Sequence, residues 1–262
     1  MSSAPATIEF GDARIAIATW NEEAVGAGDT IVLLHDGLGS IRQWRGVPER
    51  VAAATGRRVI AYERPGHGAS TPVPTGPWPT RWLHHEADRL RGILDAMDVR
   101  RPVLVGHSDG GSIALIAAMN GLDCAGVVAI AMHTWVEPIC RRSIIEMRDD
   151  ADRFVRGLAR YHDHPAAVFE AWSGVWVSDE FAEWDIRPDL HGIDAPTVIS
   201  QGDADEYATA AMVTDTVEAI GDNARGIFVP GGRHLLHHGD EDAVVDLVTS
   251  FVAELGRAVD EP

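Results

Sequence analysis

Short apolar runs alternate with longer segments of helical apolar spacing along most of the chain, and this alternation restricts the fold more than any other feature. The runs that predict strands are 30–34, 58–62, 102–105, 126–132, 196–200 and 226–229. The segments that predict helices are 42–54, 80–97, 111–119, 207–220 and 240–255. Apolar strands separated by helices are typical of a parallel sheet covered on both faces. The alternation therefore predicts the α/β class.

Two stretches depart from this alternation. Residues 7–20 alternate apolar and polar side chains around a Gly-Asp pair, which predicts a β-hairpin. Residues 133–193 contain helical segments and no convincing strand, which predicts a helical cap inserted between two strands of the sheet. For a chain of 262 residues we expect one core, formed by residues 1–132 and 194–262, with the cap at 133–193.

The composition excludes several classes of ligand and location. The formal net charge of −18 disfavours nucleic acid and membranes as partners, so we expect a small-molecule substrate. The chain contains no lysine, which excludes a pyridoxal-phosphate Schiff base and a lysine-containing phosphate loop. Cys124 and Cys140 are too few for a disulfide framework or a zinc site. Residues 1–10 lack a signal-peptide pattern, and no apolar run reaches about 18 residues, so we expect a cytoplasmic protein.

The segment Gly106-His-Ser-Asp-Gly110 matches the pattern G-x-S-x-G between a predicted strand and a predicted helix. That setting is typical of a nucleophile elbow, in which a strained turn projects the serine oxygen above the sheet. Glycines two positions before and after the serine let the strand and the helix approach closely. Ser108 is therefore the predicted nucleophile. The alternative is an ordinary strand-to-helix turn with a capping serine.

A serine nucleophile needs backbone N–H groups that stabilise the oxyanion forming on its substrate. One is expected from Asp109, the residue after the serine, and the other from the glycine-rich loop at residues 35–40. Gly37 is the candidate in that loop, with Leu38 as the alternative donor. A loop that is rich in glycine for its shape alone is the competing interpretation.

Asp36 and Asp109 flank this predicted oxyanion hole, where an inward-pointing carboxylate would oppose the developing negative charge. We expect both side chains to point away and to accept backbone hydrogen bonds that stiffen their loops. The alternative is that one of them lines the pocket and favours a cationic group on the substrate.

The serine also needs a base, and the base needs an acid that orients it. Residues 202–206 read Gly-Asp-Ala-Asp-Glu after a predicted strand. Asp205 is the candidate acid because its position places it over the sheet edge. Asp203 and Glu206 compete with it but are expected to form turns or to be solvated.

The glycines before His234 allow a tight loop that brings its imidazole over the serine, which makes His234 the candidate base. His237 and His238, at the approach to the final helix, are its rivals. The remaining histidines lack the spacing or the carboxylate neighbours of a helical metal site, so no metal ion is expected. Those expected to be structural include His67 and His107.

These motifs together resemble the α/β-hydrolase superfamily over nearly the whole chain, and in particular its small capped bacterial members. The matching segments are 35–40, 64–70, 106–111, 202–205 and 232–234. The resemblance implies an eight-stranded, mostly parallel sheet with one antiparallel strand, helices on both faces, a helical cap and no cofactor. It carries the triad roles to Ser108, Asp205 and His234. Most members have His-Gly where this chain has His35-Asp36, which leaves the oxyanion donor of that loop open.

A pocket is expected where the cap meets the triad. The side chains expected to line it are Asp36, Leu38, His133, Trp135, Trp172 and Trp176. The tryptophans would exclude water from the substrate, or they would serve only to fix the cap to the core.

The triad and the pocket predict a cofactor-free serine hydrolase that cleaves a small, neutral, partly hydrophobic carboxylic ester or lactone through an acyl-enzyme. Two alternatives stay open. The same triad could hydrolyse an activated carbon–carbon bond, and a ligand-binding sensor of low turnover could keep the fold. The sequence does not determine the oligomeric state.

Overall fold

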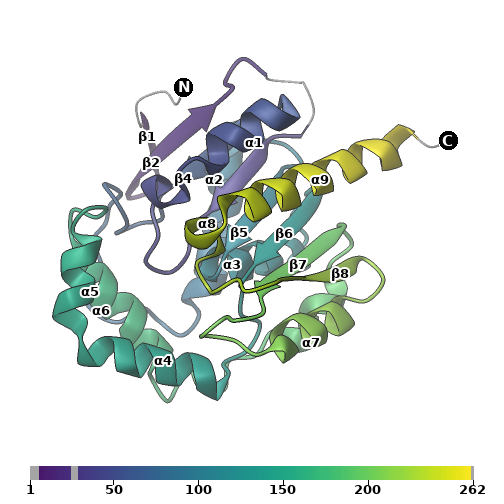
Figure 1. Ribbon diagram of the computed structural model, residues 1–262. Helices are drawn as coiled ribbons and strands as arrows, with labels where there is room; N and C mark the ends of the chain where they lie inside the picture. The colour runs from purple at the N-terminus through teal and green to yellow at the C-terminus, as the bar shows by residue number, and fades with distance from the viewer. Residues whose placement is uncertain (1–5, 25–28, 261–262) are drawn as a thin grey trace.

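The computed structural model describes residues 6–24 and 29–260. Within them, eight strands form one sheet in the order β1-β2-β4-β3-β5-β6-β7-β8 (Figure 1). The strands are β1 (Ala6–Phe10), β2 (Ala13–Trp20), β3 (Ile31–Leu34), β4 (Val59–Tyr62), β5 (Val103–His107), β6 (Gly126–Ile130), β7 (Thr197–Gly202) and β8 (Ala224–Val229). Strand β2 runs antiparallel to both neighbours, and all other pairs are parallel. The predicted sheet is therefore confirmed.

Apolar strands alternate their side chains between two buried clusters, one on each face of the sheet. In β3, Val32 and Leu34 pack in one cluster, and Ile31 and Leu33 pack in the other. The helices that cover the first cluster are α2 (Trp82–Ala96), α3 (Asp109–Met119) and α7 (Ala210–Ile220). Those that cover the second are α1 (Val47–Thr55) and α9 (Glu241–Asp260). Both faces are therefore covered, as the apolar runs predicted.

The predicted helix 42–54 is interrupted in the structure. Residues Ile41–Trp44 form a 3-10 turn, and α1 begins only at Val47. Arg45, between them, has φ of 52°, a left-handed conformation that a right-handed helix cannot contain. Pro48 then lies in the first turn of α1, where the missing N–H costs nothing. The prediction of helical structure in this segment is confirmed, but the spacing of apolar residues does not indicate the break at Arg45.

Three helices and a 3-10 turn occupy the segment expected to form the cap. They are α4 (Pro138–Asp149), α5 (Ala151–Leu158), α6 (Pro165–Trp176) and the turn at Arg187–Gly192. Figure 1 shows α4, α5 and α6 grouped beside the sheet. The only strand-like pairing among residues 133–193, all of which the structure describes, is a single bridge between Trp135 and Asp185.

Two observations bear on the expected location of the protein. Of residues 1–10, in which no signal peptide was predicted, the first five lie outside the described residues. None of the helices within 6–24 and 29–260 combines the length and the hydropathy needed to span a membrane.

Loops that follow four parallel strands meet at one edge of the sheet. Strand β3 leads into the glycine-rich loop 35–40, and β5 leads directly into Ser108. Strand β7 is followed by Asp205, and β8 is followed by His234. Parallel strands place their carboxyl ends on the same side. The topology therefore brings every predicted triad residue and the predicted oxyanion loop to this edge.

Candidate active site

Ser108 occupies a sharp turn between β5 and α3. Its backbone has φ of 50° and ψ of −122°, a conformation that is costly for a residue with a side chain. The turn fits only because glycines flank it. A Cβ on Gly106 would collide with the backbone of Gly110, and a Cβ on Gly110 would collide with the carbonyl of Leu34. These contacts explain the pattern G-x-S-x-G and give the elbow geometry expected of a nucleophile.

The structure brings Ser108, His234 and Asp205 into one hydrogen-bonded row. The Nε2 atom of His234 lies 3.1 Å from Oγ of Ser108, and its Nδ1 atom lies 3.0 and 3.1 Å from the carboxylate oxygens of Asp205. The Asp205 side chain is fully buried, and its Oδ1 also accepts the backbone N–H of Tyr207 at 2.8 Å. A carboxylate only accepts, so Nδ1 of His234 carries the proton and Nε2 is free to accept from the serine.

The charges around the row favour a protonated His234. Burial alone would lower the pKa of His234, but the carboxylate of Asp205 outweighs it and raises this pKa above its ordinary value. Burial likewise opposes ionisation of Asp205, but the adjacent imidazole lowers the pKa of that carboxyl below its ordinary value. Asp205 is therefore positioned to stabilise the imidazolium that forms when His234 accepts a proton.

The rival histidines point elsewhere. Both lie in the short helix α8 (Leu236–Gly239). The Nε2 atom of His238 lies 3.2 Å from the carbonyl oxygen of Gln43, and the ring of His237 packs 5.1 Å from that of Trp44. Neither histidine has a hydrogen bond to Ser108 within the described residues.

The two rival acids have different roles, and one differs from its prediction. Asp203 accepts the backbone N–H of Gly231, as expected of a turn residue. Glu206 was expected to form a turn or to be solvated. Instead its carboxylate accepts the backbone N–H of His234 at 3.2 Å and pairs with Arg233. Glu206 therefore holds the histidine loop in place and also lines the pocket.

The hydrogen bonds of the 35–40 loop distinguish the two candidate oxyanion donors. The N–H of Leu38 donates to Oδ1 of Asp36 at 2.9 Å, so this donor is already engaged. In the part of the chain that the structure describes, the N–H groups of Gly37 and Asp109 donate to no protein atom, and both residues line the cavity at Ser108. Gly37 and Asp109 therefore remain the expected donors.

The side chain of Asp109 does not point away from the pocket as expected. Its Oδ2 accepts a hydrogen bond from Nε1 of Trp172 in the cap at 2.8 Å, and the residue lines the cavity while being buried. Burial raises the pKa of Asp109 to about 7. Asp36 accepts the backbone bond that was expected, yet it lines the cavity as well. The prediction was wrong for Asp109 because its partner comes from the cap.

A cavity of about 350 Å³ opens onto the triad between the cap and the sheet edge. Five of the six predicted pocket residues line it, namely Asp36, Leu38, His133, Trp172 and Trp176. The lining residues that the sequence did not indicate are Gln43, Cys140, Ile144, Met147, Phe154, Leu158, Glu206, Tyr207 and Leu235. Several of these are apolar side chains on the inner faces of α4 and α5. The sequence showed that these helices are amphipathic. It did not show which apolar side chains face the triad, because that depends on how the cap packs against the sheet edge.

Trp135, the sixth predicted residue, does not line the cavity. Its ring lies 4.1 Å from the guanidinium carbon of Arg187, and its backbone pairs with Asp185. Two contacts with one short segment thus hold the indole against the end of the cap. His133 does line the cavity, but burial and the nearby His234 lower its pKa to about 4. His133 is therefore neutral at pH 7.

The predicted oxyanion loop is held by buried polar side chains, of which only His67 was expected from the sequence to be structural. Arg64 is almost fully buried, and its guanidinium donates to the carbonyls of His35 and Asp36, both at 2.6 Å. A nitrogen of the His67 ring lies 2.9 Å from the carbonyl oxygen of Gly37, and a nitrogen of the His162 ring lies 3.0 Å from that of Leu38. Carbonyls engaged in this way fix the direction of the N–H groups that follow them.

One further group could hold a metal ion. Asp36, His107 and His237 place potential ligand atoms within 4.8 Å of one another, next to the triad.

A family model described as the alpha/beta hydrolase family matches residues 31–247, which include the elbow, the acid loop and the histidine loop. The chain belongs to this family. As an alpha/beta hydrolase, it places a serine rather than an aspartate at the elbow and a helical segment between β6 and β7.

Curated relatives of this alpha/beta hydrolase carry several activities. The chain is 29% identical to a non-heme haloperoxidase of Rhodococcus erythropolis, over 75% of this chain and 82% of the relative. It is 26% identical to a bifunctional esterase/perhydrolase of Acinetobacter calcoaceticus, with the same shares covered. Among solved structures, the enol-lactonase of Burkholderia xenovorans matches with a TM-score of 0.72 and 21% identity, over 95% of this chain and 100% of the enol-lactonase. That structural likeness establishes the fold alone.

Proposed function

We propose that this alpha/beta hydrolase is a cofactor-free serine hydrolase that cleaves a small, neutral, partly hydrophobic carboxylic ester or lactone. The observation that carries the proposal is the buried row in which His234 lies between Ser108 and Asp205. A serine, an imidazole and a carboxylate in this order are the parts of an acyl-transfer triad. The cavity at their end is lined largely by apolar side chains, which suits an uncharged acyl group.

In the first half of the reaction, Nε2 of His234 takes the proton from Oγ of Ser108 while that oxygen bonds to the carbonyl carbon. The carbonyl oxygen becomes an oxyanion and accepts hydrogen bonds from the N–H groups of Gly37 and Asp109. The tetrahedral intermediate then expels the alcohol, which receives the proton from His234. The product of this half is an ester between Ser108 and the acyl group.

In the second half, His234 takes a proton from a water molecule, and the resulting hydroxide oxygen bonds to the acyl carbon. The second tetrahedral intermediate releases Oγ of Ser108, which regains its proton from His234. Asp205 keeps its negative charge throughout and stabilises the imidazolium in both halves. For a lactone, the leaving alcohol is part of the same molecule.

The sharpest test compares initial rates on a panel of p-nitrophenyl esters, lactones and ring-cleavage diketones. We expect ester or lactone turnover, and we expect Ser108→Ala to reduce it by several orders of magnitude. Ser178→Ala is a matched control, because Ser178 bonds to the backbone of the cap away from the cavity. Turnover of the diketones alone would replace the proposal by carbon–carbon bond hydrolysis. Absence of any turnover that depends on Ser108 would point to a binding role.

A further inference from the structure

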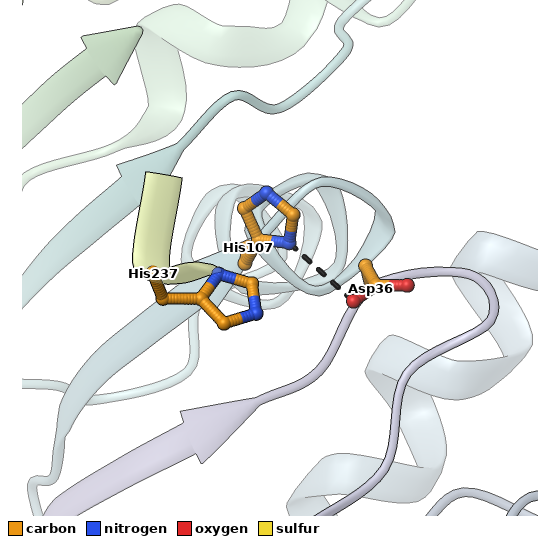
Figure 2. A group of neighbouring side chains, drawn as sticks. All are labelled: Asp36, His107 and His237. Carbon is orange, nitrogen blue, oxygen red and sulfur yellow. Dashed lines mark ion pairs between the residues drawn. The ribbon is translucent and has the colours of Figure 1, made fainter. Parts of the chain in front are cut away.

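Asp36, His107 and His237 form a second polar cluster directly beside the triad. Asp36 follows β3, His107 is the last residue of β5, and His237 lies in α8. One ligand atom from each lies within 4.8 Å of the other two. Figure 2 shows the two rings and the carboxylate turned toward one another. The three residues come from distant parts of the chain, which is why no spacing motif revealed them.

One ring nitrogen of His107 bonds to the backbone, and the other faces the cluster without a hydrogen bond to any described residue. Its Nε2 atom lies 2.8 Å from the carbonyl oxygen of His234. A carbonyl only accepts, so Nε2 carries a proton. In the neutral ring, Nδ1 then carries a lone pair. Among residues 6–24 and 29–260, this buried Nδ1 has no hydrogen-bond partner, and it lies 3.5 Å from Oδ2 of Asp36. Nδ1 of His107 and Oδ2 of Asp36 therefore face each other in one buried space, which either a metal ion or a proton on Nδ1 would bridge.

Backbone hydrogen bonds hold the outer atoms of Asp36 and His107, as is typical of residues that bind metal ions. Oδ1 of Asp36 is fixed by the N–H of Leu38, which leaves Oδ2 for the cluster. The outer ring N–H of His107 is fixed by a backbone carbonyl, which is one of the partners that orient metal-binding histidines. His237 is buried, and its ring lies 4.6 Å from that of His107.

We propose that Asp36, His107 and His237 bind one divalent transition-metal ion of the zinc class. Two imidazoles and one carboxylate are ligands typical of zinc and unlike the all-oxygen sites of calcium and magnesium. Ligand atoms around tetrahedral zinc lie about 3.3 Å apart. The separation of 3.5 Å between His107 and Asp36 already matches this value. His237 has to move inward to reach an ion held between His107 and Asp36, because the three ligand atoms are spread over as much as 4.8 Å.

An ion at this position would connect three segments that serve the triad. Asp36 belongs to the oxyanion loop, His107 precedes the nucleophile, and His237 follows the catalytic histidine by three residues. The ion would touch none of the reacting atoms, so its role is to hold the loops together. The proposal rests on this geometry and stays separate from the proposed hydrolase activity.

The test measures metal binding directly on the full chain after treatment with a chelator. We expect one equivalent of Zn²⁺ to bind in a competition titration and to raise the melting temperature, with one equivalent of Co²⁺ giving visible absorption bands of a low-coordinate site. His237→Gln should weaken Zn²⁺ binding by at least about 100-fold. His238→Gln is the matched control, because His238 lies on the same short helix but faces the carbonyl of Gln43. Asp36→Asn gives a second test if His237→Gln does not fold.

Each outcome decides the matter. Stoichiometric binding that is lost in His237→Gln or Asp36→Asn and kept in His238→Gln supports the site. Binding that survives both substitutions would place the metal elsewhere and overturn the proposal. Failure of the wild-type chain to bind Zn²⁺ or Co²⁺ would also overturn it, and a proton shared by His107 and Asp36 would then occupy the space.

Discussion

The imidazole of His234 is held between a buried carboxylate and a hydroxyl, so its protonation state is set by opposing effects. Burial lowers the pKa of His234, and the charge of Asp205 raises it by more. A general base works only in its neutral form. The raised pKa therefore means that the neutral base forms at a higher pH than it would in an unperturbed histidine.

We predict that kcat/KM on a neutral ester rises with pH through an inflection above that of an ordinary histidine. Asp205→Asn removes the charge that raises the pKa, so burial then dominates and the inflection moves to lower pH. The same change should lower kcat by roughly 10³- to 10⁴-fold, because the imidazolium loses its partner. A pH–rate profile of each variant measures both effects. Asp203→Asn is the control, and an inflection that Asp205→Asn leaves in place would contradict the prediction.

Asp109 is a second residue whose charge matters, because it lies beside the predicted oxyanion hole with a pKa raised to about 7. Asn in its place still accepts the hydrogen bond from Trp172 but carries no charge. Above pH 7 we expect Asp109→Asn to raise kcat/KM on neutral esters several-fold, since a negative charge no longer opposes the oxyanion. Near pH 5, where Asp109 is already protonated, the two proteins should match. Lower activity of Asp109→Asn at pH 8 would show that the reaction uses this charge.

Ionisation of the buried Asp109 should also affect stability. Its pKa is raised on folding, so the folded state binds the proton more tightly than the unfolded chain does. The stability gained from this proton is present at low pH and is lost as pH rises toward the folded pKa of about 7. Asp109→Asn should therefore melt at a higher temperature than the wild type at pH 8, and this advantage should be clearly smaller at pH 5, where only the unfolded chain has lost the proton. An equal advantage at both pH values would contradict the linkage.

The three residues of the proposed triad could be selected from the sequence because each follows a strand within a short glycine-rich segment. Ser108, Asp205 and His234 meet in the structure as the predicted topology requires. The direction of Asp109 could not be predicted in this way, because its partner Trp172 belongs to a cap helix whose docking the sequence does not specify. The prediction that Trp135 lines the cavity was wrong for the same reason, since its ring packs against Arg187 instead.

At the scale of elements, the loop between β3 and the 3-10 turn is rigid because buried donors hold its carbonyls. Arg64 contributes two such bonds at 2.6 Å from a side chain that is almost fully buried. Its carbonyl partners would have no replacement in a variant that lacks the guanidinium. The loop carries the predicted oxyanion donor Gly37, so its order bears on activity as well as on stability.

We predict that Arg64→Met lowers the free energy of unfolding by about 2–4 kcal/mol, because buried carbonyls lose their donors. Turnover should fall too, since the N–H of Gly37 loses its fixed direction. Urea unfolding followed by fluorescence measures the first effect. Arg100→Met is the control, because Arg100 forms only exposed ion pairs, and it should change stability by less than about 0.5 kcal/mol. Equal losses in both variants would contradict the proposed role of Arg64.

The elements themselves were more predictable than their ends. Each predicted strand and helix of the core is present, because continuous apolar runs and helical spacing record burial directly. The exception is the helix predicted at 42–54, which breaks where Arg45 takes a left-handed conformation. The side chain of Arg45 also donates a hydrogen bond to the carbonyl of His238. The spacing of apolar residues therefore could not predict the left-handed conformation of Arg45.

At the scale of the whole molecule, several hydrogen bonds join the cap segment to the loops at the sheet edge. Trp172 of α6 donates to Asp109 at the start of α3. His162, after α5, lies 3.0 Å from the carbonyl oxygen of Leu38. The cap therefore closes the cavity through bonds to the two segments that supply the predicted oxyanion donors.

We predict that Trp172→Phe loosens the cap, because an aromatic ring is kept while the N–H donor to Asp109 is lost. A bond to a charged carboxylate is stronger than one to a neutral acid, so the loss of stability should be about 1–3 kcal/mol at pH 8 and smaller at pH 5. Trp184→Phe is a matched control, because the buried Nε1 of Trp184 has no hydrogen-bond partner within the described residues. Denaturant unfolding at both pH values measures the difference. A loss for Trp172→Phe that does not depend on pH would contradict the role of the Asp109 charge.

The central claim is that His234 activates Ser108 as a nucleophile, and the rate of labelling by a fluorophosphonate tests it without knowledge of the substrate. The labelled protein is digested and the modified residue is identified by mass spectrometry. We predict that the wild type is labelled at Ser108 alone, and that His234→Ala slows labelling by at least about 10³-fold. A label on another residue, or a rate that His234→Ala leaves unchanged, would contradict the account.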